Sequence, residues 1–456
     1  MEPIYISSIV KEVRGNIVNC SGELSVNGIS TDSRTIKEGD LFVPIIGENY
    51  DGHDFIKNAI KSGAVAVLSD RYLDNSTIPY IKVKNTEIAL INIARYYRKK
   101  FDIPAIAITG SSGKTTTKEM VAAVLCQSFN VLKNEGNYNN TIGLPHTIFK
   151  LNKNHEICVM EMGMNSFGEI SKLASIVSPD LALITNIGSA HIEFLGSREN
   201  ILKAKMEIVE NFTRNDTLII NGDDKMLKTL DRKGFTIISV GLDKDNDIIA
   251  YDIEQLGNEG MEFSVSFKNK SARFYLPVIG LHNVYNGLFS IAVGLYKDMS
   301  LKKIKEGLAG FEPPAMRMET FILNDGIRII NDAYNANPES VKAAITALTN
   351  IQSRYRKILV LGDMMELGKY SEYEHYQIGK MIAFNNIDML ITIGKRAKNI
   401  QQGALESGMA DAFHFENNKE GLDCLLDRLL PYDTVLIKGS RSAKMEEIAY
   451  FLHERR

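Results

Sequence analysis

The sequence predicts an α/β protein of three domains whose larger sheets are mostly parallel. Its 456 residues exceed what one hydrophobic core usually supports, which favours two or three domains. From Ile103 onward, short apolar runs alternate with stretches of helical periodicity, a pattern typical of a parallel sheet covered by helices on both faces. The alternation stops at Pro313-Pro314 and then restarts, so a further α/β domain is expected after this pair.

The N-terminal domain is expected to span residues 1–84 and to be a small α/β module. Its strands are predicted by short apolar runs at 41–43, 64–68 and 81–83. Apolar side chains at helical spacing then predict a helix over residues 85–100 that leads into the next domain.

The central domain is expected to span residues 85–313. Its parallel strands are predicted by apolar runs at 106–108, 157–160, 181–185 and 218–220. Apolar and polar residues alternate from Met261 to Phe267, which predicts antiparallel strands at the far edge of the sheet.

The C-terminal domain, residues 314–456, is expected to be Rossmann-like. Its strands are predicted by apolar runs at 327–330, 358–361, 390–393 and 435–437. This part of the chain has no GxGxxG motif of its own, so it need not bind a dinucleotide.

The composition is that of an ordinary globular protein and excludes several classes. A formal net charge of −3 with no basic cluster argues against a nucleic-acid partner. No apolar run approaches the ~20 residues of a membrane span, and the N-terminus lacks a signal-peptide pattern, so we expect a cytoplasmic protein. Four scattered cysteines without CxxC spacing predict neither a zinc site nor a disulfide framework, and we expect them to be small buried hydrophobes.

The most informative segment is a glycine-containing loop between a predicted strand and a predicted helix. It consists of Thr109, Gly110, Ser111, Ser112, Gly113, Lys114, Thr115 and Thr116. Glycines let backbone N–H groups turn toward an anion, and the following helix N-terminus adds its positive dipole end. Lys114 would then reach the outer phosphates and Thr115 would ligate Mg²⁺.

The spacing of this loop leaves a second interpretation open. Only two residues separate its glycines, whereas the general nucleotide motif has four, so a simple helix-capping turn is the alternative. The strand before it and the amphipathic helix after it favour nucleotide binding.

Three further side chains are candidates for metal chemistry, although each has an ordinary alternative. Glu161 ends an apolar strand run, where a carboxylate can hold Mg²⁺ or simply face solvent. His191 follows the next strand and could equally be a core or surface histidine. Lys205 lies in a helical pattern, for which an exposed lysine is the default expectation.

Two loops are rich in amide and hydroxyl groups. Residues 136–141 include Asn139, Asn140 and Thr141, which suit hydrogen bonds to sugar, carboxylate or phosphate but are also common in turns. Residues 331–338 follow the first strand of the third domain and carry more polar groups than a connector requires, which favours a ligand role.

In this order, the segments resemble the Mur ligases over nearly the whole chain. The shared segments are Ser30-Thr31-Asp32-Ser33-Arg34, Gly39-Asp40-Leu41-Phe42, residues 109–117, residues 136–145, Glu161-Met162-Gly163, residues 185–207, His282-Asn283 with Asn286, and Arg317-Met318-Glu319. The more specific segments are residues 332–338, residues 361–368 and Lys438-Gly439-Ser440-Arg441-Ser442. The likeness is strongest to members that join D-alanyl-D-alanine to UDP-N-acetylmuramoyl-tripeptide.

That resemblance implies an ATP-dependent, ADP-forming amide ligase of peptidoglycan precursor synthesis. It implies a UDP-sugar-peptide domain, a central P-loop ATPase domain and a C-terminal domain that receives the dipeptide. In the family, ATP phosphorylates the substrate's terminal carboxylate, and the amine of D-alanyl-D-alanine then attacks the acyl phosphate. The family is usually monomeric.

The resemblance also implies roles for individual residues. Lys114, Glu161, His191 and Lys205 are expected to be catalytic, with two Mg²⁺ ions held by Thr115, Glu161, His191 and a carbamylated Lys205. Asn283 and Asn286 are expected near adenine and ribose, while Arg317 and Asp332 close on the nucleotide. Substrate contacts are expected at Asp32, Ser33, Arg34, Asn139, Asn140, Thr141, Asn335, Asn337, Lys438 and Ser440.

The sequence departs from the family pattern at two positions, and two other functions are alternatives to this ligase activity. Ser112 stands where the family usually has Asn, and Ala333 where it often has Ser; neither change removes Lys114, Thr115 or Asp332. Another ligase of the superfamily, tripeptide-forming or folylpolyglutamate-forming, is the nearer rival, and the segments at 334–338 and 362–368 argue against it. The remote rival is an ATP-gated binding protein without ligase activity.

Overall fold

The computed structural model describes residues 1–47, 49–73, 77–231, 234–268, 270–351 and 355–454. Close packing divides the chain into two compact units. The first comprises residues 1–107, 129–182 and 206–216, and the second comprises residues 108–128, 183–205 and 217–456.

The N-terminal segment of the first unit forms a five-stranded sheet. Its order is β2 (Asn16–Val18), β7 (Tyr80–Lys82), β6 (Ala66–Ser69), β5 (Asp40–Phe42) and β4 (Gly28–Ser30). All neighbouring pairs are parallel except β2 with β7. The three predicted strands are confirmed as β5, β6 and β7. Helices α1 (Ile6–Val13) and α2 (Ile56–Lys61) belong to the same module, which also holds the short antiparallel pair β1 (Ile4–Tyr5) and β3 (Ser25–Val26).

The predicted connecting helix is α3 (Thr86–Arg98). Asn85 caps it by accepting a hydrogen bond from the Ile88 backbone N–H at 2.8 Å, which satisfies one of the free amides of the first turn. Its buried face includes Leu90, Ile93 and Ala94, in agreement with the predicted periodicity.

The largest sheet has nine strands. In spatial order they are β16 (Lys270–Leu276), β15 (Gly260–Phe267), β14 (Ile248–Leu256), β13 (Thr236–Gly241), β12 (Thr217–Asn221), β11 (Leu181–Ile184), β8 (Ala105–Thr109), β10 (Ile157–Glu161) and β9 (Val131–Lys133). β14, β15 and β16 pair antiparallel, so the predicted antiparallel edge is confirmed. Core strands such as β8 and β10 are buried along their whole length.

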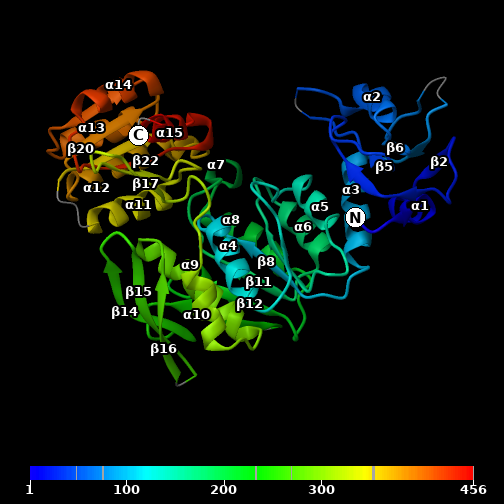
Figure 1. Cartoon of the computed structure of the whole chain (residues 1–456), viewed down its shortest axis with the longest axis horizontal. Helices are drawn as coiled ribbons and strands as arrows, with labels where there is room; N and C mark the ends of the chain where they lie inside the picture. Colours follow the sequence, from blue (N-terminus) through cyan, green and yellow to red (C-terminus); the bar gives the residue numbers. More distant parts are fainter. Residues whose placement is uncertain (48, 74–76, 232–233, 269, 352–354, 455–456) are drawn as a thin grey trace. The chain divides into compact units, whose positions relative to one another are not determined.

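Helices of the second unit pack beside this sheet. α9 (Leu281–Tyr296) contacts α4 (Lys114–Leu125) and strands β13 to β15, and α10 (Leu301–Ala309) contacts both helices (Figure 1). Two shorter helices, α7 (Ile192–Leu195) and α8 (Arg198–Met206), follow β11. In the first unit, α5 (Gly143–Ile148) and α6 (Glu169–Val177) both contact α3.

The C-terminal sheet has six strands and confirms the predicted Rossmann-like alternation. Its order is β17 (Glu319–Ile322), β18 (Arg328–Asn331), β22 (Thr434–Lys438), β19 (Lys357–Gly362), β20 (Met389–Ile393) and β21 (Ala412–Phe415). Only β17 runs antiparallel.

Alternate side chains of this sheet enter two separate cores. One core joins it to α11 (Pro338–Asn350), α12 (Ser371–Ala383) and α13 (Lys398–Glu406). The other joins it to α14 (Asn418–Arg428) and α15 (Glu446–Glu454). The sheet is therefore doubly wound, and its parallel strands present their carboxyl ends along one edge.

The structure corrects the expectation about the four cysteines. Cys158 and Cys424 are buried as expected, but Cys126 is exposed and Cys20 only half-buried, so the expectation of four buried cysteines was wrong. In the described ranges, no helix is both long and apolar enough to cross a membrane.

Candidate active site

The glycine-containing loop lies between β8 and α4, as the sequence predicts. Gly110 and Gly113 have φ values of 154° and 78°, and neither could carry a side chain without collision. A Cβ on Gly110 would lie 1.8 Å from the Thr185 hydroxyl oxygen, and one on Gly113 would lie 2.8 Å from Asn286 Oδ1. Gly113 directly precedes α4 with this left-handed backbone and gives the helix no side-chain cap.

A second loop, residues 185–188, supports the first. Asn186 O accepts from the Ser111 N–H at 3.1 Å, and Asn186 Oδ1 accepts from the Ser112 N–H at 3.0 Å. The Asn186 amide in turn donates to Ser112 Oγ at 2.9 Å, and the Gly188 N–H donates to Ser111 Oγ at 2.9 Å. Ser112, which departs from the family pattern, therefore keeps a side-chain contact.

Lys114 and Thr115 begin α4 at the mouth of this loop. The Lys114 ammonium donates to the Gly110 carbonyl at 2.8 Å and so spans the loop. Thr115 Oγ1 accepts from the Arg317 guanidinium at 3.3 Å, and that guanidinium also lies over the Tyr334 ring, 4.2 Å from its centroid. Arg317 therefore reaches the phosphate-binding loop.

Asn283 and Asn286 lie on the first turns of α9, where both are buried. The Asn286 amide donates to Asn283 Oδ1 at 3.0 Å, and Thr117 Oγ1 donates to Asn286 Oδ1 at 3.0 Å. Asn286 thus couples α9 to the helix that follows the loop. Burial lowers the pKa of the neighbouring His282 to about 4, so this imidazole is neutral at pH 7.

Glu161, in the first unit, is the last residue of β10 and is only 2% exposed, so the alternative of a solvent-facing carboxylate was wrong. The Asn139 amide donates to Glu161 Oε1 at 2.8 Å, and Asn134 exchanges hydrogen bonds with the Glu161 backbone. A buried carboxylate requires such partners. Asn139, expected to contact substrate, therefore orients Glu161 here.

The other polar residues expected to contact substrate in the first unit are partly or fully exposed to solvent. Asn140 Oδ1 accepts from the Gly143 N–H at the start of α5, and Thr141 Oγ1 donates to Glu87 at 2.8 Å. Arg34 forms an ion pair with Asp32 at 2.7 Å, and its hydrogen bonds lower the pKa of that carboxyl to about 2. Ser33 lies between them and is partly exposed.

Lys205 lies in α8 and is 1% exposed, so the default expectation of an exposed lysine was wrong. Burial and the nearby Lys114 charge lower its pKa well below the ordinary value for lysine. The ion pairs of the described residues give Lys205 no carboxylate partner. A buried amine in this setting favours the neutral form.

His191 contacts a residue that is distant in the sequence. Its Nδ1 lies 2.6 Å from Glu366 Oε2, and the Glu193 N–H donates to the Glu366 carbonyl at 3.2 Å. His191 and Glu366 both have left-handed backbones, with φ values of 65° and 62°, which cost energy in residues other than glycine. Such strain at two residues in contact is typical of functional sites.

Two more C-terminal side chains reach the same loops. The Asn337 amide donates to the Ser111 carbonyl at 3.3 Å. The Glu339 carboxylate accepts from the Ser189 backbone N–H at 2.9 Å and from its hydroxyl at 3.0 Å. Sequence reasoning did not single out Glu339, whereas Asn186 and Glu366 lie within the shared segments 185–207 and 361–368 without having been assigned a role.

Asp332 follows β18 and pairs with Lys438, the last residue of β22. The Lys438 ammonium, 3% exposed, donates to Asp332 Oδ2 at 2.6 Å and to the Asn335 carbonyl at 3.0 Å. Asn335 Oδ1 accepts from the Ala336 N–H, and Ser440 is buried beside Ser442. Ala333, the second departure, is fully buried in the core beside α14 and α15.

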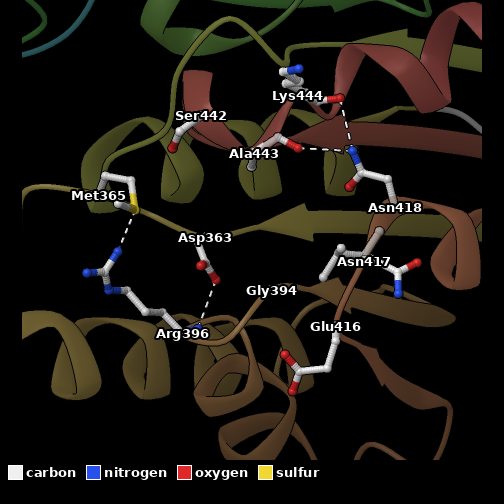
Figure 2. Close-up of a pocket in the computed structure, with 11 residues that line it drawn as sticks. Asp363, Met365, Gly394, Arg396, Glu416, Asn417, Asn418, Ser442, Ala443 and Lys444 are labelled. Carbon is white, nitrogen blue, oxygen red and sulfur yellow. Dashed lines mark hydrogen bonds between the residues drawn. The ribbon is translucent and has the colours of Figure 1, made fainter. Parts of the chain in front are cut away.

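A cavity of about 400 Å³ opens at the carboxyl edge of the C-terminal sheet (Figure 2). It is lined by the last residue of β20 and by residues that follow β19, β20, β21 and β22. These are Asp363, Met365, Ile393, Gly394, Arg396, Glu416, Asn417, Asn418, Ser442, Ala443 and Lys444. In the part of the chain that the structure describes, no cluster of three or more His, Cys, Asp or Glu side chains is placed to hold a metal.

Three family models match consecutive parts of the chain. They are described as Mur ligase family, catalytic domain, over residues 25–99; Mur ligase middle domain, over residues 108–294; and Mur ligase, glutamate ligase domain, over residues 316–441. The chain is 38% identical over 453 residues to the UDP-N-acetylmuramoyl-tripeptide–D-alanyl-D-alanine ligase of Bacillus subtilis, covering 98% of each protein.

Solved structures are also similar over nearly their full length. Crystal structure I of MurF from Acinetobacter baumannii has a TM-score of 0.92 and 30% identity, with 100% of this chain and 99% of that chain covered. MurF ligase from Thermotoga maritima, in complex with ADP, has a TM-score of 0.85 and 28% identity, with 93% and 97% covered. On these grounds, this α/β chain belongs to the Mur ligase family.

Proposed function

We propose that this chain is an ATP-dependent ligase that joins D-alanyl-D-alanine to UDP-N-acetylmuramoyl-tripeptide. The observation that carries the proposal is the phosphate-binding loop together with Arg317 and Asn337, which reach its Thr115 and Ser111 from beyond Pro313-Pro314. Full-length similarity to a ligase with this name supports the choice of substrates. We assign residues 1–84 to the UDP-sugar-peptide, 85–313 to ATP and 314–456 to the dipeptide.

The loop is suited to phosphoryl transfer because it presents charge and backbone donors to one anion. Lys114, spanning the loop from the first turn of α4, neutralises charge that spreads over the transferred phosphoryl oxygens. Thr109, Gly110, Ser111, Ser112, Gly113 and Thr116 complete the loop. Asn283, Asn286, Arg317 and Asp332 are the remaining nucleotide contacts in this proposal.

The chemistry of the proposed donors suits two Mg²⁺ ions. Thr115, Glu161 and a carbamylated Lys205 supply oxygen, which Mg²⁺ prefers, and His191 supplies one imidazole nitrogen. When bound, Mg²⁺ neutralises phosphate charge during transfer. The 2.6 Å contact from Glu366 to His191 Nδ1 leaves Nε2 as the ligating atom, as a carboxylate partner commonly does for a metal-bound histidine.

Lys205 fits carbamylation because CO₂ reacts only with a neutral amine. The nitrogen lone pair forms a bond to the CO₂ carbon, and one N–H proton is lost to solvent, leaving an anionic carbamate. Burial next to Lys114 favours the neutral amine that this step requires. The resulting anion beside the Lys114 cation replaces a repulsion with an attraction.

Ligation then proceeds by activation and attack. The tripeptide's terminal carboxylate takes the γ-phosphoryl group of ATP, releasing ADP. The dipeptide amine forms a bond to the acyl carbon, and phosphate leaves with the bonding pair while the nitrogen loses a proton. Closure of the third domain about Pro313-Pro314 would exclude water that otherwise hydrolyses the acyl phosphate.

The substrate contacts proposed from the family are Asp32, Ser33, Arg34, Asn139, Asn140, Thr141, Asn335, Asn337, Lys438 and Ser440. We propose that the chain acts as a monomer in the cytoplasm, where ATP and nucleotide-linked sugars are available.

The test measures phosphate release with UDP-N-acetylmuramoyl-tripeptide, D-alanyl-D-alanine, ATP and Mg²⁺, omitting each in turn. Release should require all four components, and a product larger by the dipeptide should appear by mass spectrometry. Release that is indifferent to the dipeptide and the UDP-substrate would contradict the ligase proposal. Lysine-containing and diaminopimelate-containing tripeptides, assayed side by side, would establish the third residue.

A further inference from the structure

The side chains expected to bind the dipeptide are largely engaged within the protein. Lys438 uses its three N–H donors on Asp332 Oδ2, the Asp332 carbonyl and the Asn335 carbonyl. Asn337 caps α11 through its oxygen and donates its amide to Ser111. These residues hold strand ends and loops in place, so the dipeptide needs additional contacts.

The cavity of Figure 2 lies on the same edge of the sheet. The helices after β19 and β20 pack on one face, whereas those after β21 and β22 pack on the other. Where connections leave to opposite faces, a crevice forms outside the carboxyl ends of the strands, and ligands bind there in doubly wound proteins. The cavity has room for a ligand of dipeptide size.

Some of the charged side chains around this cavity have partners within the protein, and others have no ion pair. Asp363 Oδ1 accepts from the backbone N–H groups of Arg396 and Ala397 at 3.0 and 2.7 Å, so this carboxylate serves the turn before α13. Glu416 Oε1 lies 3.7 Å from His414 Nε2. By contrast, the ion pairs of the described chain give neither Arg396 nor Lys444 a carboxylate partner.

Arg396 is the better placed of the two cations. Its side chain is exposed and extends along the cavity wall to the Met365 sulfur (Figure 2). A guanidinium can bind a carboxylate through two parallel N–H donors. Asn417 and Asn418, at the start of α14, line the opposite side and add the positive end of a helix dipole.

We propose that this cavity binds the carboxylate end of the incoming dipeptide, with Arg396 as its specificity-determining contact. The proposal rests on the proposed ligase function and adds the group that recognises the free carboxyl terminus. Met365 lines the cavity, and the next residue, Glu366, contacts His191. A dipeptide of about 7 Å held at Arg396, which contacts Met365, can therefore place its amine near residues 365–366, and Glu366 in turn contacts His191.

The experiment compares D-alanyl-D-alanine with D-alanyl-D-alaninamide, which lacks the terminal charge, in the wild type and in Arg396→Gln. The wild type should lose roughly 10- to 100-fold in kcat/KM with the amide, the effect expected of a hydrogen-bonded charge. Arg396→Gln should lose a similar factor with D-alanyl-D-alanine, mainly in KM, and should scarcely distinguish the two ligands. Its KM for ATP should be unchanged.

Lys395→Gln is the matched control because Lys395 is exposed, adjacent in sequence and absent from the cavity lining. It should behave as the wild type, and Lys444→Gln should show a smaller loss confined to the dipeptide. Equal discrimination against the amide in the wild type and Arg396→Gln would overturn the proposal. A wild type that ligates both dipeptides equally would also overturn it, whereas a wild type that releases no dipeptide-dependent phosphate would refute the ligase function instead.

Discussion

Replacing Lys438 with methionine should destabilise the C-terminal sheet, because the pair with Asp332 joins the ends of β18 and β22. Methionine keeps most of the aliphatic volume but removes the ammonium that lies 2.6 Å from Asp332 Oδ2. The remaining donor to that carboxylate is the Met318 N–H, 3.3 Å from Oδ1. The other oxygen then loses its charged partner.

The expected magnitude follows from burial. Removing one partner of a buried ion pair costs about 3–5 kcal/mol, because the other charge stays behind without compensation. The Asp332 side chain is 13% exposed, so water reaches it in part, and we expect about 3 kcal/mol. Lys438→Met with Asp332→Asn should cost clearly less than the two single changes together, since the double variant leaves no isolated charge.

The chain contains no tryptophan, so hydrogen exchange of β18 and β22 amides is a better assay than intrinsic fluorescence. Lys395→Met, at an exposed position, should change the opening free energy by less than about 0.5 kcal/mol. Additive costs in the double variant would refute the ion-pair reasoning. If Lys438→Met leaves hydrogen exchange of these amides unchanged but raises the KM for the dipeptide, Lys438 contacts the substrate directly.

Three further outcomes are expected. Gly110→Ala should abolish measurable binding of an ATP analogue in calorimetry, because its Cβ would collide with Thr185. The control is Gly136→Ala, which also has a left-handed backbone but has open space around it, and which should bind the analogue normally. Equal binding by both variants would contradict the loop geometry. Lys205→Ala should lose activity and regain part of it with short-chain carboxylic acids, whereas full activity without rescue would remove the carbamate role. Because the pKa of His282 is lowered to about 4 in the folded protein, the unfolded state binds the extra proton at a higher pH than the folded state does. The free energy of unfolding should therefore keep its full value above about pH 6.5 and fall by up to about 3 kcal/mol as the pH drops toward 4. Urea titrations of His282→Gln should lack this loss.

The fold could be predicted from the sequence because its buried strands are short, uninterrupted apolar runs. β8, β10 and β19 each coincide with such a run, and their burial along the whole length explains why both faces are apolar. Short strands at sheet edges, such as β2 and β9, were not predicted, since partly exposed strands of three residues carry little pattern.

The site was predictable where one segment carries the chemistry and not where partners come from distant segments. The phosphate-binding loop, strand and helix are contiguous, so the glycine-containing motif together with the apolar patterns on either side of it indicated them. The burial of Lys205 depends on packing that helical periodicity does not report. Glu339 and Glu366 meet Ser189 and His191 only through tertiary structure, with about 150 or more residues between the partners.

The contacts of the C-terminal domain follow a division along its chain. The residues that reach the phosphate-binding loops lie between Arg317 and Glu366, in the first part of the domain. Apart from the residues just after β19, the cavity is built from residues 393–444, in the last part. With the proposed dipeptide site in this last part, the preference for the amine substrate could change by exchange of the later strands and loops, without change to the residues that contact the phosphate-binding loops. Chimeras joined between β19 and β20 therefore offer a route to ligases with new acceptors.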